Sequence, residues 1–120
     1  MITEEHVSFE TAKLLKEKGF NEYCYSCYVI DEIQHYDYKS RNSELIEGVI
    51  SAPTQQMAMR YLREVHNIDI FPWKIGKGVY SCAIFNSNTS QDLSSDKDFP
   101  SEKYEETAEA AIKYCLENLI

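Results

Sequence analysis

The sequence has no run of apolar residues that approaches the roughly 18 needed for a membrane-spanning helix. Its first ten residues, MITEEHVSFE, carry acidic side chains where a secretory signal peptide has basic ones. From both absences we expect a protein of the cytoplasm. In that reducing compartment we expect the four cysteines to be free thiols, because a chain of 120 residues buries a core without disulfides.

The chain is also short of positive charge. Its 12 lysines and arginines stand against 20 aspartates and glutamates, which gives a net charge of −8. This charge argues against generic binding to nucleic acids, because a polyphosphate backbone normally requires a basic surface. It favours solubility and a basic or neutral partner. Residues 51–78 are the exception, since their four basic and two acidic side chains give a net charge of +2.

No catalytic motif occurs in the sequence. It lacks the GxSxG of serine hydrolases, the HExxH of zinc proteases and the GxxxxGK[ST] phosphate loop. The stretch KIGKG, residues 74–78, has no helix after it to bind a phosphate, so it predicts a hairpin turn. His35 lies in a polar segment that faces solvent, and His66 lies where the end of a helix favours a cation. We therefore expect no cofactor and no catalytic residue.

One CxxC pair, Cys24 and Cys27, has the spacing of a metal or redox site. It lies in EYCYSCYVI, residues 22–30, whose aromatic and β-branched residues predict a strand. Side chains three apart on a strand point to opposite faces, so these thiols cannot chelate one ion there. Cys82 and Cys115 are single, and a redox CxxC opens a helix rather than following one. The pattern therefore favours packing in a strand over a metal or redox site.

Periodic apolar patterns predict three helices. The stretch SFETAKLLKEKG, residues 8–19, has Ser8 as an N-cap and Gly19 where a left-handed C-cap belongs. Residues 51–67, SAPTQQMAMRYLREVHN, carry apolar side chains at i, i+3, i+4 and i+7. From about Ser101 onward a wide apolar stripe predicts a closing helix.

Alternating patterns predict the strands. The first is residues 22–30, and residues 45–50 predict a short second strand. Residues 68–86 predict a β-hairpin with glycines in its loop. Residues 31–44 are polar and show neither the helical nor the strand period, which predicts a loop or an irregular hairpin connection. Residues 87–100 predict a loop.

These elements predict a single α+β domain over residues 1–120. Its order is α-β-(β)-α-β-β-α, a two-layer fold in which three helices cover one face of a small, mostly antiparallel sheet of three or four strands. The other face of such a sheet would expose tyrosines and serines, and half-polar aromatic faces often bind a partner. The fold therefore favours an interaction with another protein or with a second copy of the chain.

Three stretches of the sequence resemble those of a known family: ETAKLLKEKGF, SAPTQQMAMRYLREVHNIDI and YEETAEAAIKYCLENLI. In them the chain resembles small proteins from gut anaerobic bacteria and their phages or mobile elements. The shared pattern is a helix ending in KGF, a helix that starts at APT and ends at HN, and a last helix rich in Glu and Ala. The resemblance implies one domain. It implies no catalytic residue, because no activity is assigned to that family.

The basic middle segment supplies the candidate partner-binding residues. Arg60 and Arg63 lie on the polar face of the second predicted helix, and Trp73, Lys74 and Lys77 follow in the predicted hairpin. Together they would form a basic patch with an aromatic anchor, which fits an acidic protein segment or a short nucleic acid stacked on the tryptophan. The alternative is that the arginines are only solvated and that the tryptophan belongs partly to the core.

These observations leave three functions open. The one we favour is a non-enzymatic accessory protein that binds a protein partner or itself through its sheet face or the basic patch. The second is a nucleic-acid-binding protein that uses the same patch. The third is a small metal- or thiol-dependent enzyme that uses His35, His66 or the cysteines. We expect no membrane partner.

Overall fold

A computed structural model describes residues 4–94 and 99–120, and it has the predicted α+β fold with three helices and antiparallel strands. No helix among these residues has the length and apolar character to span a bilayer. In chain order the elements are α1 (Phe9–Glu17), β1 (Cys24–Val29), β2 (Glu32–Ser40), the 3₁₀ helix η1 (Asn42–Glu44), β3 (Val49–Ser51), α2 (Gln55–His66), β4 (Ile68–Gly76), β5 (Val79–Asn86) and α3 (Tyr104–Asn118).

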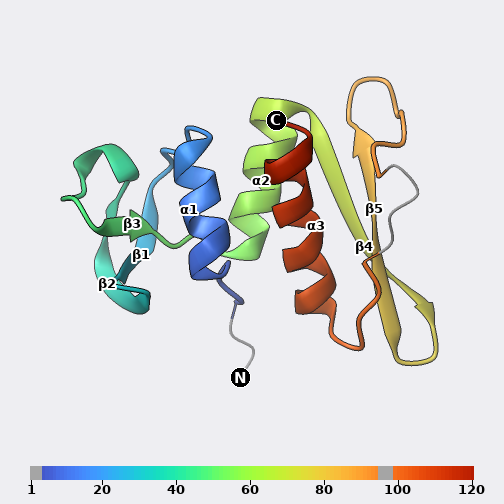
Figure 1. Cartoon of the computed structure of the whole chain (residues 1–120), viewed down its shortest axis with the longest axis horizontal. Coiled ribbons are helices and arrows are strands. Elements are labelled where there is room, and N and C mark those ends of the chain that lie inside the picture. Colours follow the sequence, from blue (N-terminus) through green and yellow to red (C-terminus); the bar gives the residue numbers. More distant parts are fainter. Residues whose placement is uncertain (1–3, 95–98) are drawn as a thin grey trace.

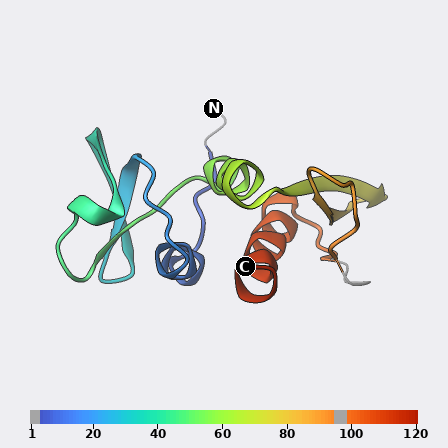
Figure 2. The same cartoon turned by 90° about the horizontal axis from the view of Figure 1, so that it is seen from above.

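The three helices lie between two separate sheets, as Figures 1 and 2 show from two directions. One sheet has the strand order β2-β1-β3, and the other is the β4-β5 hairpin. The sequence predicts one sheet with helices on one face, so the layering differs from the prediction. The reason is the path of the chain, because β3 leads into α2 and α2 leads directly into β4. The last two strands are thereby placed on the far side of the helices.

The helix ends follow local capping chemistry. Ser8 caps α1 as predicted, since its side chain accepts a hydrogen bond from the Thr11 N–H. The second helix begins later than predicted, because Ser51 belongs to β3 and Thr54 is the residue whose side chain caps α2. This helix ends at Asn67, which adopts the left-handed conformation with φ 57°.

The segment 31–44, predicted to be a loop or an irregular hairpin connection, contains the strand β2, which forms an irregular hairpin with β1. It pairs with β1 over four residues next to the turn, and then the register shifts so that residues 36–39 lie opposite Tyr25 alone. This bulge breaks the alternation of side chains, and most residues of β2 are exposed. The loop alternative was therefore wrong, and the sequence did not indicate the strand itself because such a strand carries no period-2 apolar pattern.

The predicted hairpin over residues 68–86 is confirmed. Its strands β4 and β5 are joined by a turn at residues 77–78. Of the loop predicted over residues 87–100, residues 95–98 lie outside the described residues. The described parts of that loop bond to the outer edge of β5 through the backbone of residues 91 and 93, and Ser101, which follows the loop, bonds to the same edge.

The core lies between the helices and the inner faces of both sheets. Helices α2 and α3 pack on the hairpin, and α1 packs against α3 and β3. The largest side chains that are fully buried include Leu15, Phe20, Leu62, Ile84, Ile112 and Leu116.

Candidate functional site

The β4-β5 hairpin presents a row of large apolar side chains on the face turned away from the helices. Phe71 and Trp73 alternate along β4, and Ile75 follows at a bulge, where the register shifts between Lys74 and Gly76. The three side chains are 53%, 55% and 45% exposed. The opposite strand face is the inner one, because Ile70 pairs with Ile84, which is fully buried. We call Phe71, Trp73 and Ile75 the apolar row.

The strand β5 does not cover the apolar row. The residue opposite Phe71 is Ala83, and the residue opposite Trp73 is Ser81. Both are too small to reach over the aromatic rings of β4. Phe85 extends the apolar surface at one end, since its ring centroid lies 6.0 Å from that of Phe71.

The strand β4 forms the open edge of this sheet, and Pro72 lies in its middle. On β5, backbone groups of Tyr80 and Ile84 bond to the segment 91–101 and therefore point away from β4. In an antiparallel ladder the residues opposite them, including Lys74, also point their backbone groups away from the partner strand. Pro72 shares this orientation and has no N–H, so it interrupts the row of donors at the open edge.

The structure brings three of the five predicted partner-binding residues to the hairpin. Trp73 lies in the apolar row, so it is not a core residue. Lys74 follows on the other face of β4, where its Nζ lies 6.0 Å from the ring centroid of Tyr80. Lys77 is exposed in the turn that joins the two strands.

The two arginines lie on α2, outside the hairpin. Arg60 is exposed, and its Nε lies 3.2 Å from Glu64 Oε1. It lines a groove next to Tyr23 and Tyr25, on the side of the helices that faces the three-stranded sheet. Arg63 is exposed in the last turn of α2. Arg60 therefore belongs to a different surface from Trp73.

The groove beside Arg60 has a volume of about 430 Å³. Its rim is aromatic and charged, and the ring of Tyr23 lies 4.9 Å from the guanidinium of Arg41 and 5.9 Å from Nζ of Lys39. The sequence did not indicate this groove, because one side of it depends on the unpredicted strand β2. Two acidic and two basic side chains line it, so it favours no ligand of one charge. The lining residues are Glu22, Tyr23, Tyr25, Lys39, Met57, Arg60, Tyr61 and Glu64.

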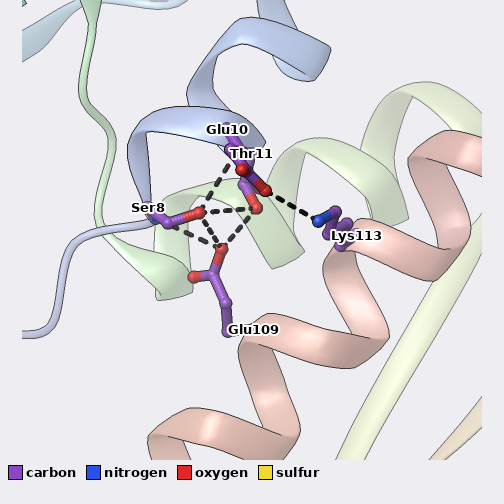
Figure 3. Close-up of polar contacts among 5 residues, drawn as sticks. All are labelled: Ser8, Glu10, Thr11, Glu109 and Lys113. Atoms are coloured by element: carbon purple, nitrogen blue, oxygen red, sulfur yellow. Dashed lines mark hydrogen bonds and ion pairs between the residues drawn. The ribbon is translucent and has the colours of Figure 1, made fainter. Parts of the chain in front are cut away.

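A larger open cleft, of about 690 Å³, lies between the N-terminal segment, β1, α2 and the first half of α3. Glu109 of α3 lies in it and accepts three hydrogen bonds from the start of α1, as Figure 3 shows. The donors are the Ser8 N–H at 3.2 Å, the Ser8 hydroxyl at 2.9 Å and the Thr11 hydroxyl. A carboxylate is favourable at a helix N-terminus, so Glu109 joins α1 to α3.

The polar groups of this cleft are not arranged as a Ser-His-Asp triad. Ser8 donates directly to Glu109, without an imidazole between hydroxyl and carboxylate. The histidine of the cleft, His6, packs against His35 with ring centroids 5.1 Å apart. Burial, and then the charge of His35, lower the pKa of His6. His35 itself bonds to Ser26, at 2.6 Å, but that serine is buried and out of reach of a substrate.

The thiols and the second candidate histidine take part in packing. Burial raises the pKa of Cys24 and of Cys115 to about 12, which suppresses the reactive thiolate. Cys24 Sγ lies 3.6 Å from Met57 Sδ, and His66 Nε2 lies 3.2 Å from the Tyr61 hydroxyl. Within residues 4–94 and 99–120, no three His, Cys, Asp or Glu side chains are grouped to hold a metal ion. All four cysteines are free and buried: Cys24, Cys27, Cys82 and Cys115.

Comparison with protein-family models, with curated proteins and with solved structures finds no match to this chain. The resemblance to small proteins of gut anaerobes and their phages therefore stays a prediction.

Proposed function

We propose that this chain is a non-enzymatic interaction protein of the cytoplasm, and that it binds a protein partner through the apolar row of β4. The observation that supports the proposal is the exposure of Phe71 and Trp73, two aromatic side chains that stand side by side on one strand face. The largest contiguous apolar patch on a monomeric protein is typically about 300 to 600 Å² and often functional, and the apolar row, at roughly 300 Å², is at the lower end of this range. Aromatic side chains are also the residues that contribute most at protein interfaces.

The apolar area that the row can bury favours a modest affinity. The exposed half of a large aromatic side chain amounts to roughly 100 Å², and burying it contributes about 2 to 3 kcal/mol. Association itself costs about 4 to 15 kcal/mol in lost freedom. The three side chains of the apolar row therefore support binding, but a tight complex needs further contacts around them.

The same end of the hairpin supports a second candidate, binding to single-stranded nucleic acid. Trp73 is exposed for stacking on a base, and Lys77 lies nearby in the turn. The net charge of −8 opposes this function, because it repels a phosphate backbone. We therefore place it second.

The test is capture of partners from lysate of the source organism by the tagged protein, with and without nuclease. Three proteins are compared: the wild type, Trp73→Ala, and the control Tyr38→Ala. Tyr38 is a matched control because it is 59% exposed and lies on β2, in the other sheet. We expect a nuclease-resistant protein that the wild type and the control retain and that Trp73→Ala loses at least about tenfold.

Two outcomes would contradict the proposal. If all three proteins retain the same partners, the apolar row is not the binding surface. If retention disappears with nuclease and the bound material absorbs at 260 nm, the nucleic-acid function replaces it.

A further inference from the structure

We propose that the partner of the apolar row is the apolar row of a second copy of this chain, packed face to face and antiparallel about a two-fold axis at Trp73. The inference rests on the proposed function, because it names the occupant of the same surface. The occupant follows from the spacing of the row, the charges at its ends, the open edge of β4 and the size of the patch.

The apolar row is complementary to itself. Phe71 and Ile75 flank Trp73 along the strand, Ile75 at the bulge, so a two-fold axis at Trp73 brings the Phe71 end of one copy to the Ile75 end of the other. The two tryptophans then meet at the centre. In a dimer with two-fold symmetry, both subunits use the same patch, so that patch must be complementary to itself. A short row with its largest side chain in the middle can face a second copy of itself in this way.

The charges at the two ends of the row select the antiparallel arrangement. Asp69 is the next residue on the same face of β4, at the Phe71 end of the row. Its ladder partner Phe85 forms a backbone β-bridge with Asp92, so a second acidic residue lies near this end. At the other end stands Lys77, which is exposed in the turn. An antiparallel pair sets each acidic end against the basic end of the second copy, whereas a parallel pair would set like charges together.

The open edge of β4 disfavours the competing arrangement, in which two copies pair edge to edge. Backbone groups along that edge would have to form a continuous ladder between the copies. Pro72 lies at an outward-pointing position in the middle of β4 and cannot donate. Packing of the strand faces needs no backbone donor, so Pro72 leaves this arrangement intact.

The size of the patch predicts a weak dimer. Six half-exposed side chains, three from each copy, amount to roughly 600 Å². Stable interfaces bury about 1,200 to 2,000 Å². Each copy also carries a net charge of −8, which opposes approach of the two molecules. Association is therefore expected only at high protein concentration.

Trp73 reports on this surface directly, because it is the only tryptophan of the chain. We would measure sedimentation equilibrium and tryptophan emission on the same samples, from about 10 µM to about 1 mM, the range in which weak complexes form. The expected result is a weight-average mass that rises from 14.0 kDa toward twice that value. Over the same concentrations the emission should move to shorter wavelength and acrylamide should quench it less.

Three substitutions test the arrangement while they keep the tryptophan. Phe71→Ser should raise the dissociation constant about tenfold or more. Asp69→Lys and Lys77→Asp should each weaken the dimer severalfold, and the double variant should restore it, because the charges are exchanged between facing ends. Tyr38→Ser serves as the control and should leave the dimer unchanged. Circular dichroism and urea unfolding of each variant check that it folds.

Each result decides between the alternatives. A mass that stays at 14.0 kDa up to about 1 mM overturns the dimer. If the wild type is monomeric but Trp73→Ala loses a captured protein, the proposed function stands and its partner is a different protein. A dimer that Phe71→Ser does not weaken uses another surface, and a double charge variant without recovery contradicts the antiparallel arrangement.

Discussion

Glu109 is a side chain through which the last helix bonds to the start of the first. Its Oε2 accepts from Ser8 and Thr11, and its Oε1 lies 3.4 Å from Gln55 Nε2 at the start of α2. One carboxylate thus contacts all three helices. Hydrogen bonds to a charged group contribute about 1.5 to 3 kcal/mol each, more than bonds between neutral groups.

We predict that Glu109→Ala lowers the free energy of unfolding by about 2 to 4 kcal/mol, because it leaves Ser8 and Thr11 without their acceptor. The measurement is equilibrium unfolding in urea. Glu117→Ala is the control, since Glu117 lies on the same helix and is exposed. A loss of stability of the same size in both variants would show that the effect is one of helix charge alone.

The second prediction at this scale concerns His6. Burial and His35 lower its pKa below the ordinary value of 6.5, although Glu4 and Glu5 oppose the shift. The unfolded chain therefore binds more protons than the folded one between the lowered pKa and pH 6.5. The free energy of unfolding is therefore unaffected by this titration above pH 6.5, and it declines as the pH falls from 6.5 toward the lowered pKa of His6. Urea unfolding at a series of pH values measures the decline.

Substitution identifies the histidine responsible. His6→Gln should flatten the decline, because glutamine does not titrate. His66→Gln removes a histidine that bonds to Tyr61 on α2, and it should leave the decline in place. If the two variants behave alike, His6 is not the group that titrates.

The apolar row was only partly predictable from the sequence. Trp73 was predicted as an aromatic anchor, whereas Phe71 and Ile75 were not singled out. The signal for them is the alternation in IDIFPWKIG, but this strand carries apolar residues on both faces. The sequence does not say which face the helices cover. Arg60 was grouped with Trp73 for a similar reason, since nearness along the chain does not reveal that α2 presents that arginine to a different surface.

At the scale of elements, the turn between β1 and β2 is under backbone strain. Ile30 and Asp31 both have positive φ, 50° and 58°, in a two-residue hairpin turn. A β-branched residue is unfavourable in this conformation, and Asn-Gly is the favoured pair there. Ile30 is also 83% exposed, so its side chain gives little packing in return.

We therefore predict that Ile30→Asn combined with Asp31→Gly stabilises the protein by about 1 to 2 kcal/mol. The expected readout is a rise in the midpoint of thermal unfolding. Ile46→Asn is the matched control, because Ile46 is 76% exposed and is not among the residues with positive φ. An equal rise in the control would mean that the loss of exposed apolar surface, rather than relief of strain, is the cause.

The elements differed in how well the sequence indicated them. Helices were predicted because an apolar stripe and a cap are local features, and Ser8 fulfils its predicted role. The strand β2 was missed because its bulge and its exposure remove the pattern. The division into two sheets was missed because strand partners are chosen by tertiary packing, and α2 separates β3 from β4.

The whole molecule is flat, with extents of 41 × 33 × 20 Å, because the sheets and helices lie side by side. The helices nevertheless share one core with the hairpin, since buried residues of both form a single cluster. We predict one cooperative unfolding transition. Trp73 emission, which reports on the hairpin, and far-ultraviolet circular dichroism, which reports on the helices, should give the same urea midpoint. An earlier change in Trp73 emission would show that the hairpin unfolds separately.

The bonds between α1 and α3 also determine how the molecule would bear mechanical force. Ser8 meets Glu109, Glu10 meets Lys113, and Lys18 meets the backbone of Ile120, so the two helices run side by side in the same direction. Tension applied before α1 and after α3 would therefore pull the helices along their shared axis. The contacts would be loaded together, in shear, rather than opened one after another.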